Sequence, residues 1–541
     1  MAKCDDLVNK NQINMIILKP LFLQRILVSS TLFCSALLIP FCAADANAAS
    51  QSIDHYQLKP ISTTADMLAD YAVAKYGEET IESLAKLVSF NTVAVDGLTP
   101  DTNPEFIKFK AQLKQLSGQL GLDYADHGYV VLIGLGDGDR KLGVITHGDV
   151  QPADPKLWQK SPYELDKTTT PGLLIGRGTE DDKGPIVTAM YAMKAIKDKG
   201  LLLDRRIELM VYMAEESDWG PLKAFLKGFT PADINITIDA EYPVVTAEKG
   251  WSEISFLMPN ISADIDLKGP RLVAFSGGAF ASQIPQQARA TIINADVALL
   301  QKLRQRSELQ QGMGYQFITA GDKLTILADG KSAHSSTPED GVNAVTHLAQ
   351  VLAGFSWPKS QASLTQSFIS QMIGLGIYAE QFGDIAYSDE FMGKMTLAPT
   401  VVKSTEQGTE VVMNLRRPLG KNPELLEHQT QAALTDWQKE HGVTLQHIET
   451  YWGEPKLMDK APHLTTLLSV FGHFAGVKAP KPVAIGGSTN SKLFPNALSF
   501  GPAMPGVEYT GHSEHEFITH EQFMLNLKMY TAAFVELAVK Q

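Results

Sequence analysis

The chain has 541 residues, of which 44% are hydrophobic, and its formal net charge is −13. At roughly 150 residues per domain, this length predicts two to four folded units. The acidic balance argues against a nucleic-acid partner, because phosphate binding needs a clustered cationic surface and no run of Lys or Arg supplies one.

The N-terminal segment, residues 1–48, has the pattern of a secretory signal. Lys19 and Arg25 precede a short apolar stretch, residues 26–42, and an Ala-rich segment with an Ala-x-Ala site follows. We therefore expect an exported, periplasmic protein with no stable membrane anchor after signal cleavage. The alternative is a retained anchor, which would need about 20 strongly apolar residues. Pro40 interrupts this stretch.

All three cysteines, Cys4, Cys34 and Cys42, lie within the expected signal segment. The mature protein would therefore have no thiol, which excludes disulfides, cysteine nucleophiles and thiolate metal sites together. Any metal must be held by His, Asp and Glu, a ligand set that is typical of catalytic centres.

The residues that follow predict an α/β domain. Apolar runs at residues 142–146, 207–213 and 234–238 are typical of buried strands. Residues 182–197 lie between the first two runs and carry apolar side chains at helical spacing, with Pro185 in the expected first turn. Strands that alternate with helices predict a mostly parallel sheet with helices on both faces.

The middle of the chain, residues 254–450, is predicted to be an inserted α+β lid domain. Its strand-like segments are each followed by a helical stretch. The strands are residues 289–293, 323–328 and 409–415, and the clearest helices are residues 333–355 and 423–440. This order predicts two related βαβ-like halves. The catalytic domain is then discontinuous and consists of residues 49–253 and 451–541.

Five short segments concentrate charged residues, most of them at the ends of predicted strands. They are residues 146–152, 176–185, 213–218, 238–243 and 511–516. Ligands of open α/β sheets bind beyond the carboxyl ends of the strands, so this placement favours a common site. The adjacent Glu215 and Glu216 repel one another unless a cation lies between them or one takes up a proton. A metal ligand beside a general base meets that requirement, and a solvated loop is the alternative.

Taken singly, the other segments have structural explanations as well. His147 can bind a metal while Asp149 holds its far ring nitrogen, but a single His is more often a satisfied surface or core residue. Asp181 and Asp182 can simply cap the helix that follows them. Together the segments supply two histidines, three ligand carboxylates and one spare carboxylate. Two divalent cations would nearly neutralise three carboxylates and a bridging hydroxide, so a buried two-metal centre is electrostatically tolerable.

In this order, the motifs resemble the aminoacylase and carboxypeptidase family of co-catalytic zinc peptidases. The matching motifs are His-Gly-Asp-x-x-Pro at 147–152, Asp-Asp-Lys-Gly-Pro at 181–185, Glu-Glu at 215–216, Asp-Ala-Glu at 239–241 and His-x-x-x-Glu at 512–516. Gly-Arg-Gly-x-x-Asp-Asp-Lys-Gly-Pro and Asp-Ala-Glu-x-Pro are most similar to the PepV-like dipeptidase branch. The resemblance extends from about Thr64 to the C-terminus.

The resemblance implies two zinc ions per subunit, for which Co²⁺ or Mn²⁺ can substitute. The five implied ligands are His147, Asp181, Glu216, Asp239 and His512. Asp181 would bridge both ions through a cis peptide bond to Asp182. His147 and Asp239 would complete one ion, and Glu216 and His512 the other. His515 replaces the usual Asn or Asp of the family and is the alternative to His512.

The resemblance also implies the catalytic residues. Glu215 would take a proton from the metal-bound water and deliver it to the leaving amine, and Asp149 would orient His147. His334, from the lid, would stabilise the tetrahedral oxyanion across the cleft. The alternative for His334 is a surface histidine at the start of a helix.

The substrate carboxylate would be held by Arg416, a planar bidentate donor, and by backbone donors at Gly487 and Ser488. A surface ion pair is the alternative role for Arg416. Two departures from the family pattern affect this region. Ser282 stands where the dipeptidase branch often has Asn, and residues 490–492 are Asn-Ser-Lys where relatives tend to carry Tyr-Ala-Arg. The oxyanion and carboxylate contacts can therefore differ from those of the family.

The implied activity is that of an exported, monomeric dipeptidase that acts on small peptides with a free carboxyl terminus. A carboxypeptidase or an N-acyl-amino-acid deacylase would use the same chemistry with a different pocket. An exported solute-binding protein is the alternative from another class. That alternative has no use for a spare carboxylate, so Glu215 beside Glu216 argues against it.

Overall fold

The computed structural model describes residues 56–261 and 269–540. The expected signal segment, residues 1–48, lies outside the described residues. In the part of the chain that is described, none of the helices has the length and apolar character needed to cross a membrane. The buried hydrophobic residues form two clusters. One draws on residues 65–244 and 458–538, and the other on residues 254–445.

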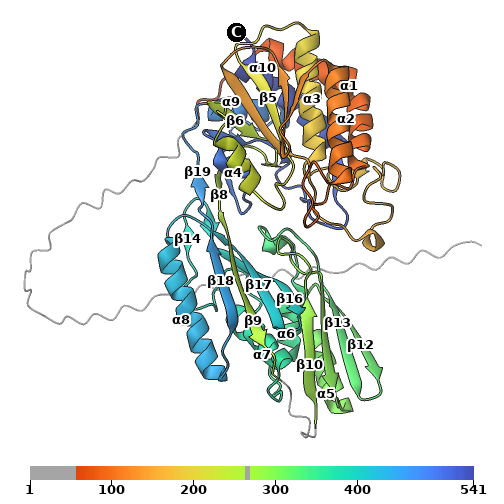
Figure 1. Cartoon of the computed structure of the whole chain (residues 1–541), viewed down its shortest axis with the longest axis vertical. Coiled ribbons are helices and arrows are strands. Elements are labelled where there is room, and N and C mark those ends of the chain that lie inside the picture. Colours follow the sequence, from red (N-terminus) through yellow and green to blue (C-terminus); the bar gives the residue numbers. More distant parts are fainter. Residues whose placement is uncertain (1–55, 262–268, 541) are drawn as a thin grey trace, which may run out of the picture. The chain divides into compact units, whose positions relative to one another are not determined.

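The first cluster is built around a nine-stranded sheet (Figure 1). Its strands are β1 (Asp123–Asp126), β2 (Val130–Leu135), β3 (Lys141–His147), β5 (Arg206–Tyr212), β6 (Ile234–Thr237), β8 (Val245–Glu248), β19 (Lys456–Leu457), β20 (Val483–Ile485) and β21 (Ala497–Ser499). Their order is β1-β2-β5-β3-β6-β21-β8-β19, with β20 paired to β8. The central strands β5, β3, β6 and β21 are parallel, whereas β1, β2 and β19 pair antiparallel to their neighbours. The sheet is therefore mixed with a parallel centre, and the predicted α/β class is confirmed.

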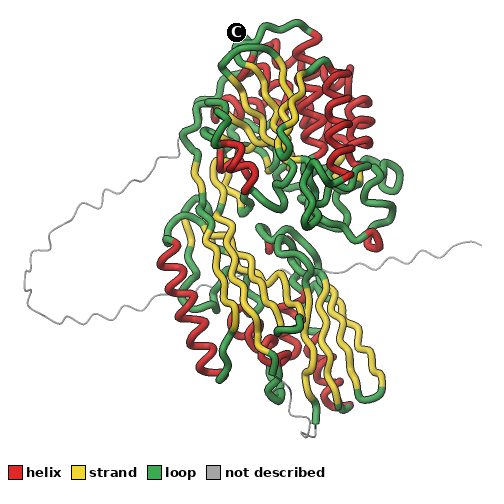
Figure 2. Tube along the Cα trace, viewed as in Figure 1, coloured by secondary structure: helices red, strands yellow, loops and turns green. Residues whose placement is uncertain are grey.

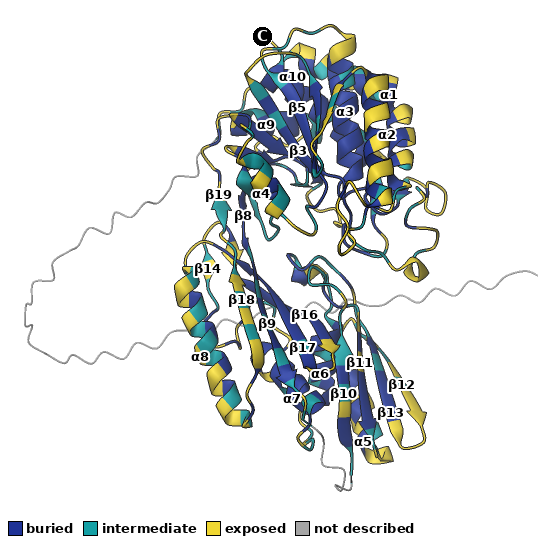
Figure 3. Cartoon of the chain, in the orientation of Figure 1, coloured by how far each residue is buried: buried dark blue, intermediate teal, exposed yellow. Residues whose placement is uncertain are grey.

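Helices cover this sheet. They are α1 (Thr63–Val88), α2 (Pro104–Leu120), α3 (Lys183–Asp198), α4 (Gly220–Leu226), α9 (Leu464–Ala475) and α10 (His520–Ala538). α1, α3 and α10 pack against one another, and both α3 and α10 contact β3 and β5. α3 is the helix predicted over residues 182–197, with Asp182 as its N-cap and Pro185 in its first turn. Its inward side chains are fully buried, whereas α1 and α2 each keep an exposed face (Figure 3).

The second cluster packs against an eight-stranded sheet in which every pair of neighbouring strands is antiparallel. In spatial order the strands are β12 (Gly314–Ala320), β13 (Lys323–Asp329), β11 (Gln287–Ile293), β10 (Arg271–Gly277), β16 (Thr396–Ser404), β17 (Gly408–Arg417), β9 (Gly250–Pro259) and β18 (Gln446–Trp452). Helix α5 (Val297–Ser307) connects β11 to β12, and β13 lies between these two strands in the sheet. Helix α8 (Pro423–His441) connects β17 to β18, and β9 lies between them. Each set of three strands and one helix is a split βαβ arrangement, which confirms the two predicted halves.

One predicted lid helix is wrong in its first half. The helix expected over residues 333–355 is α6, which begins only at Ala344 and ends at Leu352. The preceding residues form a loop and a 3-10 turn, Pro338–Asp340. A Ser-Ser-Thr-Pro run favours a turn over a helix, and the Asn343 side chain accepts backbone N–H groups and caps α6 instead. A second helix, α7 (Gln361–Phe368), follows shortly after α6.

The parallel centre of the first sheet brings the charged segments together. β3 ends at His147, β5 ends three residues before Glu215, and β6 ends two residues before Asp239. Because these three strands are parallel neighbours, their carboxyl ends share one edge of the sheet. Loops gather at this edge (Figure 2). Separate two-stranded pairs join β4 (Leu173–Ile175) with β23 (Phe517–Thr519) and β7 (Ala240–Glu241) with β22 (Pro502–Ala503). In the lid, β14 (Ser388–Asp389) pairs with β15 (Gly393–Lys394).

Candidate metal centre

The structure brings the five predicted metal ligands into one cluster. His147 Nε2 lies 2.8 Å from Asp181 Oδ1 and 3.7 Å from Asp239 Oδ1. His512 Nε2 lies 3.1 Å from Asp181 Oδ2 and 2.9 Å from Glu216 Oε1. Asp181 therefore faces a different histidine with each of its oxygens. A carboxylate held in this way can bridge two cations.

The donor atoms form two overlapping groups. In each group the ligand atoms lie within 4.8 Å of one another, and the groups are His147, Asp182 and Asp239, and His147, Asp181 and Glu216. Imidazole nitrogens and carboxylate oxygens suit zinc, cobalt or manganese. Asp182 was predicted only as a cap or as the partner of a cis bond, and its peptide bond with Asp181 is indeed cis. Asp182 Oδ2 accepts a hydrogen bond from the Thr146 hydroxyl. Within the described residues Oδ1 is buried and has no hydrogen-bond partner.

In this cluster of crowded carboxylates, the pKa values of both histidines and of Glu215 are raised. Burial alone would lower the pKa of His147, but Asp239 and the neighbouring carboxylates hold it well above its usual range. Burial also opposes protonation of His512, yet Glu216 and Asp181 raise its pKa to about 10. Burial and the charge of Asp239 raise the pKa of Glu215 well above its usual range. These shifts favour the imidazolium forms of the two histidines and the neutral carboxyl form of Glu215, and both reduce the negative charge of the cluster.

Asp149 contacts both His147 and the loop that carries Glu215 and Glu216. Its backbone carbonyl lies 3.0 Å from His147 Nδ1, whereas its carboxylate lies 3.6 Å from that nitrogen. The two carboxylate oxygens instead accept the backbone N–H groups of Glu215 and Glu216, each at 3.0 Å. The contact that was expected of the carboxylate is thus made mainly by the carbonyl. The carboxylate fixes the Glu-Glu loop.

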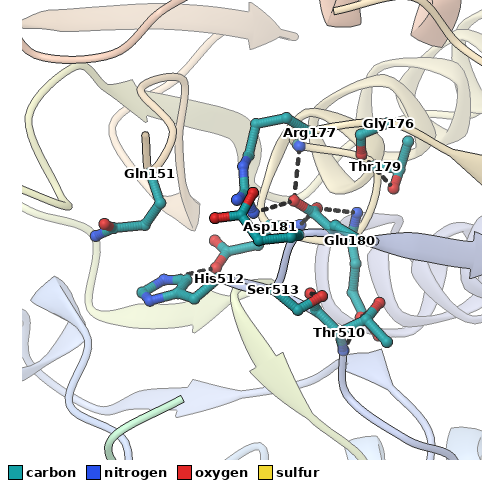
Figure 4. Close-up of polar contacts among 12 residues, drawn as sticks. Gln151, Gly176, Arg177, Thr179, Glu180, Asp181, Thr510, His512 and Ser513 are labelled. Carbon is teal, nitrogen blue, oxygen red and sulfur yellow. Dashed lines mark hydrogen bonds and ion pairs between the residues drawn. The ribbon is translucent and has the colours of Figure 1, made fainter. Parts of the chain in front are cut away.

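A second buried carboxylate, Glu516, fixes the loop that carries Asp181. Glu516 accepts hydrogen bonds from the Arg177 guanidinium at 2.9 Å and from the backbone N–H groups of Gly178, Glu180 and Asp181 at 2.9–3.0 Å. Both Arg177 and Glu516 are almost fully buried. Figure 4 shows Arg177, Glu180 and Asp181 grouped around these contacts. Glu516, which is 335 positions from Asp181 in the sequence, therefore fixes the geometry of this loop.

The lid contributes His334 to the same site. Its ring centroid lies 4.4 Å from that of His512, and Gln283 Nε2 donates to the His512 backbone carbonyl at 2.9 Å. The Ser336 backbone N–H donates to His334 Nδ1 at 3.0 Å, so the neutral ring carries its proton on Nε2. Burial, together with the charges of His512 and Arg416, holds the pKa of His334 well below its usual range. A neutral imidazole with an Nε2–H is suited to donate to a developing oxyanion.

Arg416 is buried, with 4% of its surface exposed, and its side chain is held by polar neighbours. Its Nε donates to Asn414 Oδ1 and one terminal nitrogen donates to the Ser335 hydroxyl, both at 3.0 Å. Burial lowers the pKa of Arg416 to about 9. It is thus a preorganised cation inside the protein. It does not form a surface ion pair.

Most of the candidate residues line one cleft of about 1480 Å³, whereas His147 and Asp149 are buried and do not line it. Besides metal ligands, its walls include Glu215, His334, Arg416, Gly487 and Ser488. The backbone at Gly486 passes so close to the lid that a Cβ there would come within 2.2 Å of the Ser336 carbonyl oxygen. The cleft therefore combines the catalytic-domain cluster with lid residues and with the predicted backbone-donor loop.

Several side chains outside the predicted set contact the cluster. Gln151 Nε2 donates to Glu216 Oε2 at 2.8 Å, and the Tyr509 hydroxyl donates to Asp181 Oδ2 at 2.7 Å. Gln151 lay within a charged segment that had been singled out, whereas Tyr509 had no signal beyond its nearness to His512. His515, the alternative ligand, is exposed, and the structure places His512 in the cluster instead.

Comparisons with known proteins point in the same direction. A family model for "Peptidase family M20/M25/M40" matches residues 143–536. The beta-Ala-Xaa dipeptidase of Lactobacillus delbrueckii subsp. lactis is 28% identical over 412 residues, which cover 76% of this chain and 84% of that protein. Two solved structures share the fold. The dipeptidase Dug1p of Saccharomyces cerevisiae has a TM-score of 0.55 at 16% identity, with 87% of this chain and 98% of that chain covered. Human carnosine dipeptidase 1 has a TM-score of 0.53 at 15% identity, with 87% and 99% covered.

Proposed function

Because the chain belongs to peptidase family M20/M25/M40 and is a metal-dependent hydrolase, we propose that it is an exported dipeptidase that uses two bridged zinc ions. The observation that carries this proposal is the position of Asp181, which has His147 against one oxygen and His512 against the other, at 2.8 and 3.1 Å. A carboxylate shared in this way would serve two cations at once.

The residues present fit such a centre. His147, Asp181 and Asp239 would hold one ion, and Asp181, Glu216 and His512 the other. Several buried carboxylates lie together here, and among the described residues Asp182 Oδ1 has no hydrogen-bond partner. Both features favour cations at this place. When bound, the ions supply an acidified water molecule and polarise the scissile carbonyl.

The chain's own residues would then move the proton and stabilise charge. Glu215 lines the cleft beside Glu216, where its carboxylate would accept a proton from the attacking water. The same carboxyl would return that proton to the leaving amine. His334 would donate its Nε2–H to the oxyanion from the lid.

A substrate with a free carboxyl terminus fits the rest of the cleft. Arg416 is a buried guanidinium, and Gly487 and Ser488 line the same wall. A planar guanidinium pairs well with a carboxylate. The relative from Lactobacillus is named as a dipeptidase, which supports the choice of a small peptide substrate. A carboxypeptidase or N-acyl-amino-acid deacylase would use the same metal centre. Assays on free and N-acetylated dipeptides distinguish these activities from that of a dipeptidase.

The direct test uses metal-stripped protein on a panel of free dipeptides and their N-acetylated forms. Zinc, cobalt or manganese is then added back separately. We expect hydrolysis of the free dipeptides to return with metal. Turnover of only the N-acetylated compounds would assign the chain to deacylation instead. Tight peptide binding without turnover, in the metal-loaded protein, would favour a solute-binding role.

Export is supported by the basic, apolar and Ala-x-Ala pattern of residues 1–48. Expression of the full chain in a Gram-negative host, followed by fractionation and N-terminal mass analysis, tests it. We expect periplasmic protein that begins at residue 49. Cytoplasmic protein that retains residues 1–48 would contradict export. Light scattering of the mature protein tests the proposed monomer, and a stable dimer would contradict it.

A further inference from the structure

Tyr509 touches the bridging carboxylate but has no part in the ligand set or in proton transfer. Its hydroxyl donates to Asp181 Oδ2 at 2.7 Å, the same oxygen that lies 3.1 Å from His512 Nε2. The other oxygen, Oδ1, faces His147. Tyr509 is therefore placed to influence how Asp181 is oriented between its two histidines.

The local chain is built to aim this phenol. The ring of Tyr509 lies across Gly511, where a Cβ would come within 2.2 Å of the phenolic oxygen and 2.3 Å of Cζ. Only the absence of a side chain at residue 511 leaves room for the ring. The next residue, Thr510, donates its backbone N–H and its hydroxyl to Glu180 Oε2 at 2.9 and 3.2 Å. Figure 4 shows Thr510 beside Glu180. The packing of the ring against Gly511 and the hydrogen bonds of Thr510 therefore restrain Tyr509, although 38% of its surface is exposed.

We propose that Tyr509 is a positioning residue of the metal centre, whose hydroxyl holds Asp181 in the orientation that offers one oxygen to each cation. This inference rests on the proposed function. A carboxylate oxygen has more than one acceptor direction, so Oδ2 can accept the phenol and still bind a cation. Hydrogen bonds to ligating groups fix their orientation, and their loss typically weakens metal binding by about 10–100-fold.

The Tyr509→Phe variant isolates the hydroxyl, because phenylalanine keeps the ring over Gly511. Zinc is titrated into metal-stripped wild type and variant in competition with a chelator. We expect the variant to bind at least one zinc ion about tenfold more weakly. Tyr387→Phe is the matched control, since its hydroxyl donates to the Pro418 carbonyl at 2.8 Å within the lid. The control should bind zinc as wild type does. Each variant loses one hydrogen bond, so both metal-free variants should melt slightly below wild type.

Kinetics add a second readout. If Tyr509 acts through Asp181, excess zinc should restore most of the variant's kcat and leave KM unchanged. Zinc affinity of Tyr509→Phe within about twofold of wild type would overturn the proposal, since the loss of a functional hydrogen bond to a ligand costs more. A low kcat at saturating zinc with normal zinc affinity would also overturn it and would assign the phenol to the substrate.

The outcome separates this inference from the proposed function. A wild-type protein that binds zinc in a Tyr509-dependent way and hydrolyses no dipeptide would keep the positioning role and overturn the substrate assignment. A wild-type protein that binds no zinc would overturn both.

Discussion

The Glu516 carboxylate accepts the backbone N–H of Asp181 at 3.0 Å, across 335 positions of sequence. The same carboxylate pairs with the buried Arg177 at 2.9 Å. Glu516 lies outside the ligand cluster, yet it fixes the backbone from which the bridging carboxylate projects. The metal centre thus depends on a buried ion pair behind it, and this dependence can be tested without touching a ligand.

Glu516→Gln should destabilise the protein, because Arg177 would remain buried with its charge unpaired. Removal of one partner from a buried ion pair costs about 3–5 kcal/mol, and the amide retains one acceptor, so we expect a loss near the lower figure. Urea denaturation of the metal-free variant measures it. Glu440→Gln, at an exposed position of α8, is the control and should change the free energy of unfolding by less than about 0.5 kcal/mol. Equal stability of the two variants would mean that the pair contributes nothing to the loop.

Glu215→Gln should abolish turnover while the metals stay bound. The amide keeps the size of the side chain but cannot accept a proton, so kcat should fall by about 10²–10⁴-fold. Glu216→Gln provides the contrast, because loss of a ligand carboxylate should reduce the metal content. Steady-state kinetics and elemental analysis of both variants separate the two roles. Activity of Glu215→Gln close to that of wild type would remove the general base from the mechanism.

Zinc binding should release protons at neutral pH. The pKa of His147 is raised well above its usual range and that of His512 to about 10, so both rings are protonated in the metal-free protein. Each ring must lose its proton before its nitrogen can bind a cation. Zinc affinity should therefore weaken as the pH falls and strengthen as it rises toward about 10. Calorimetric titrations at pH 7 in buffers of different ionisation enthalpy count the protons. Net proton uptake would contradict the raised pKa values of His147 and His512.

Arg416→Lys should impair recognition of a free carboxylate more than that of an amide. A hydrogen bond to a charged group contributes about 1.5–3 kcal/mol, which corresponds to about 10–150-fold in kcat/KM. Lysine retains the charge but loses the planar pair of donors. Wild type and variant are compared on a dipeptide and on its C-terminal amide. An equal loss on both substrates would show that Arg416 only supports the lid through Ser335 and Asn414.

Much of the catalytic domain follows from local sequence pattern. Strands β3, β5 and β6 are apolar runs of strand length, and α3 has helical periodicity together with Pro185 in its first turn. Tertiary contacts agree with these local preferences, so prediction and structure coincide. The lid helix expected over residues 333–355 is the counterexample. There the 3-10 turn at Pro338–Asp340 and the Asn343 cap delay the start of the helix to Ala344.

The ordered motifs and the family resemblance that they carry predicted the five converging ligands. Strand ends account for three of them, since His147, Glu216 and Asp239 lie at or just after the ends of parallel strands. The contacts of Tyr509 and Glu516 with Asp181 could not be predicted in this way. They depend on how two loops more than 300 residues apart meet, and no spacing or periodicity encodes that meeting. Asp182 had a partial signal, since it adjoins Asp181, but which carboxylate faces which histidine is set by the folded loop.

Anomalous scattering at the zinc edge, from crystals of the zinc-loaded protein, tests the central claim most directly. We predict two peaks about 3.5–4 Å apart, with one oxygen of Asp181 bound to each. His147 should lie at one peak and His512 at the other. A single peak, or two peaks whose ligands do not include Asp181, would contradict the two-metal centre.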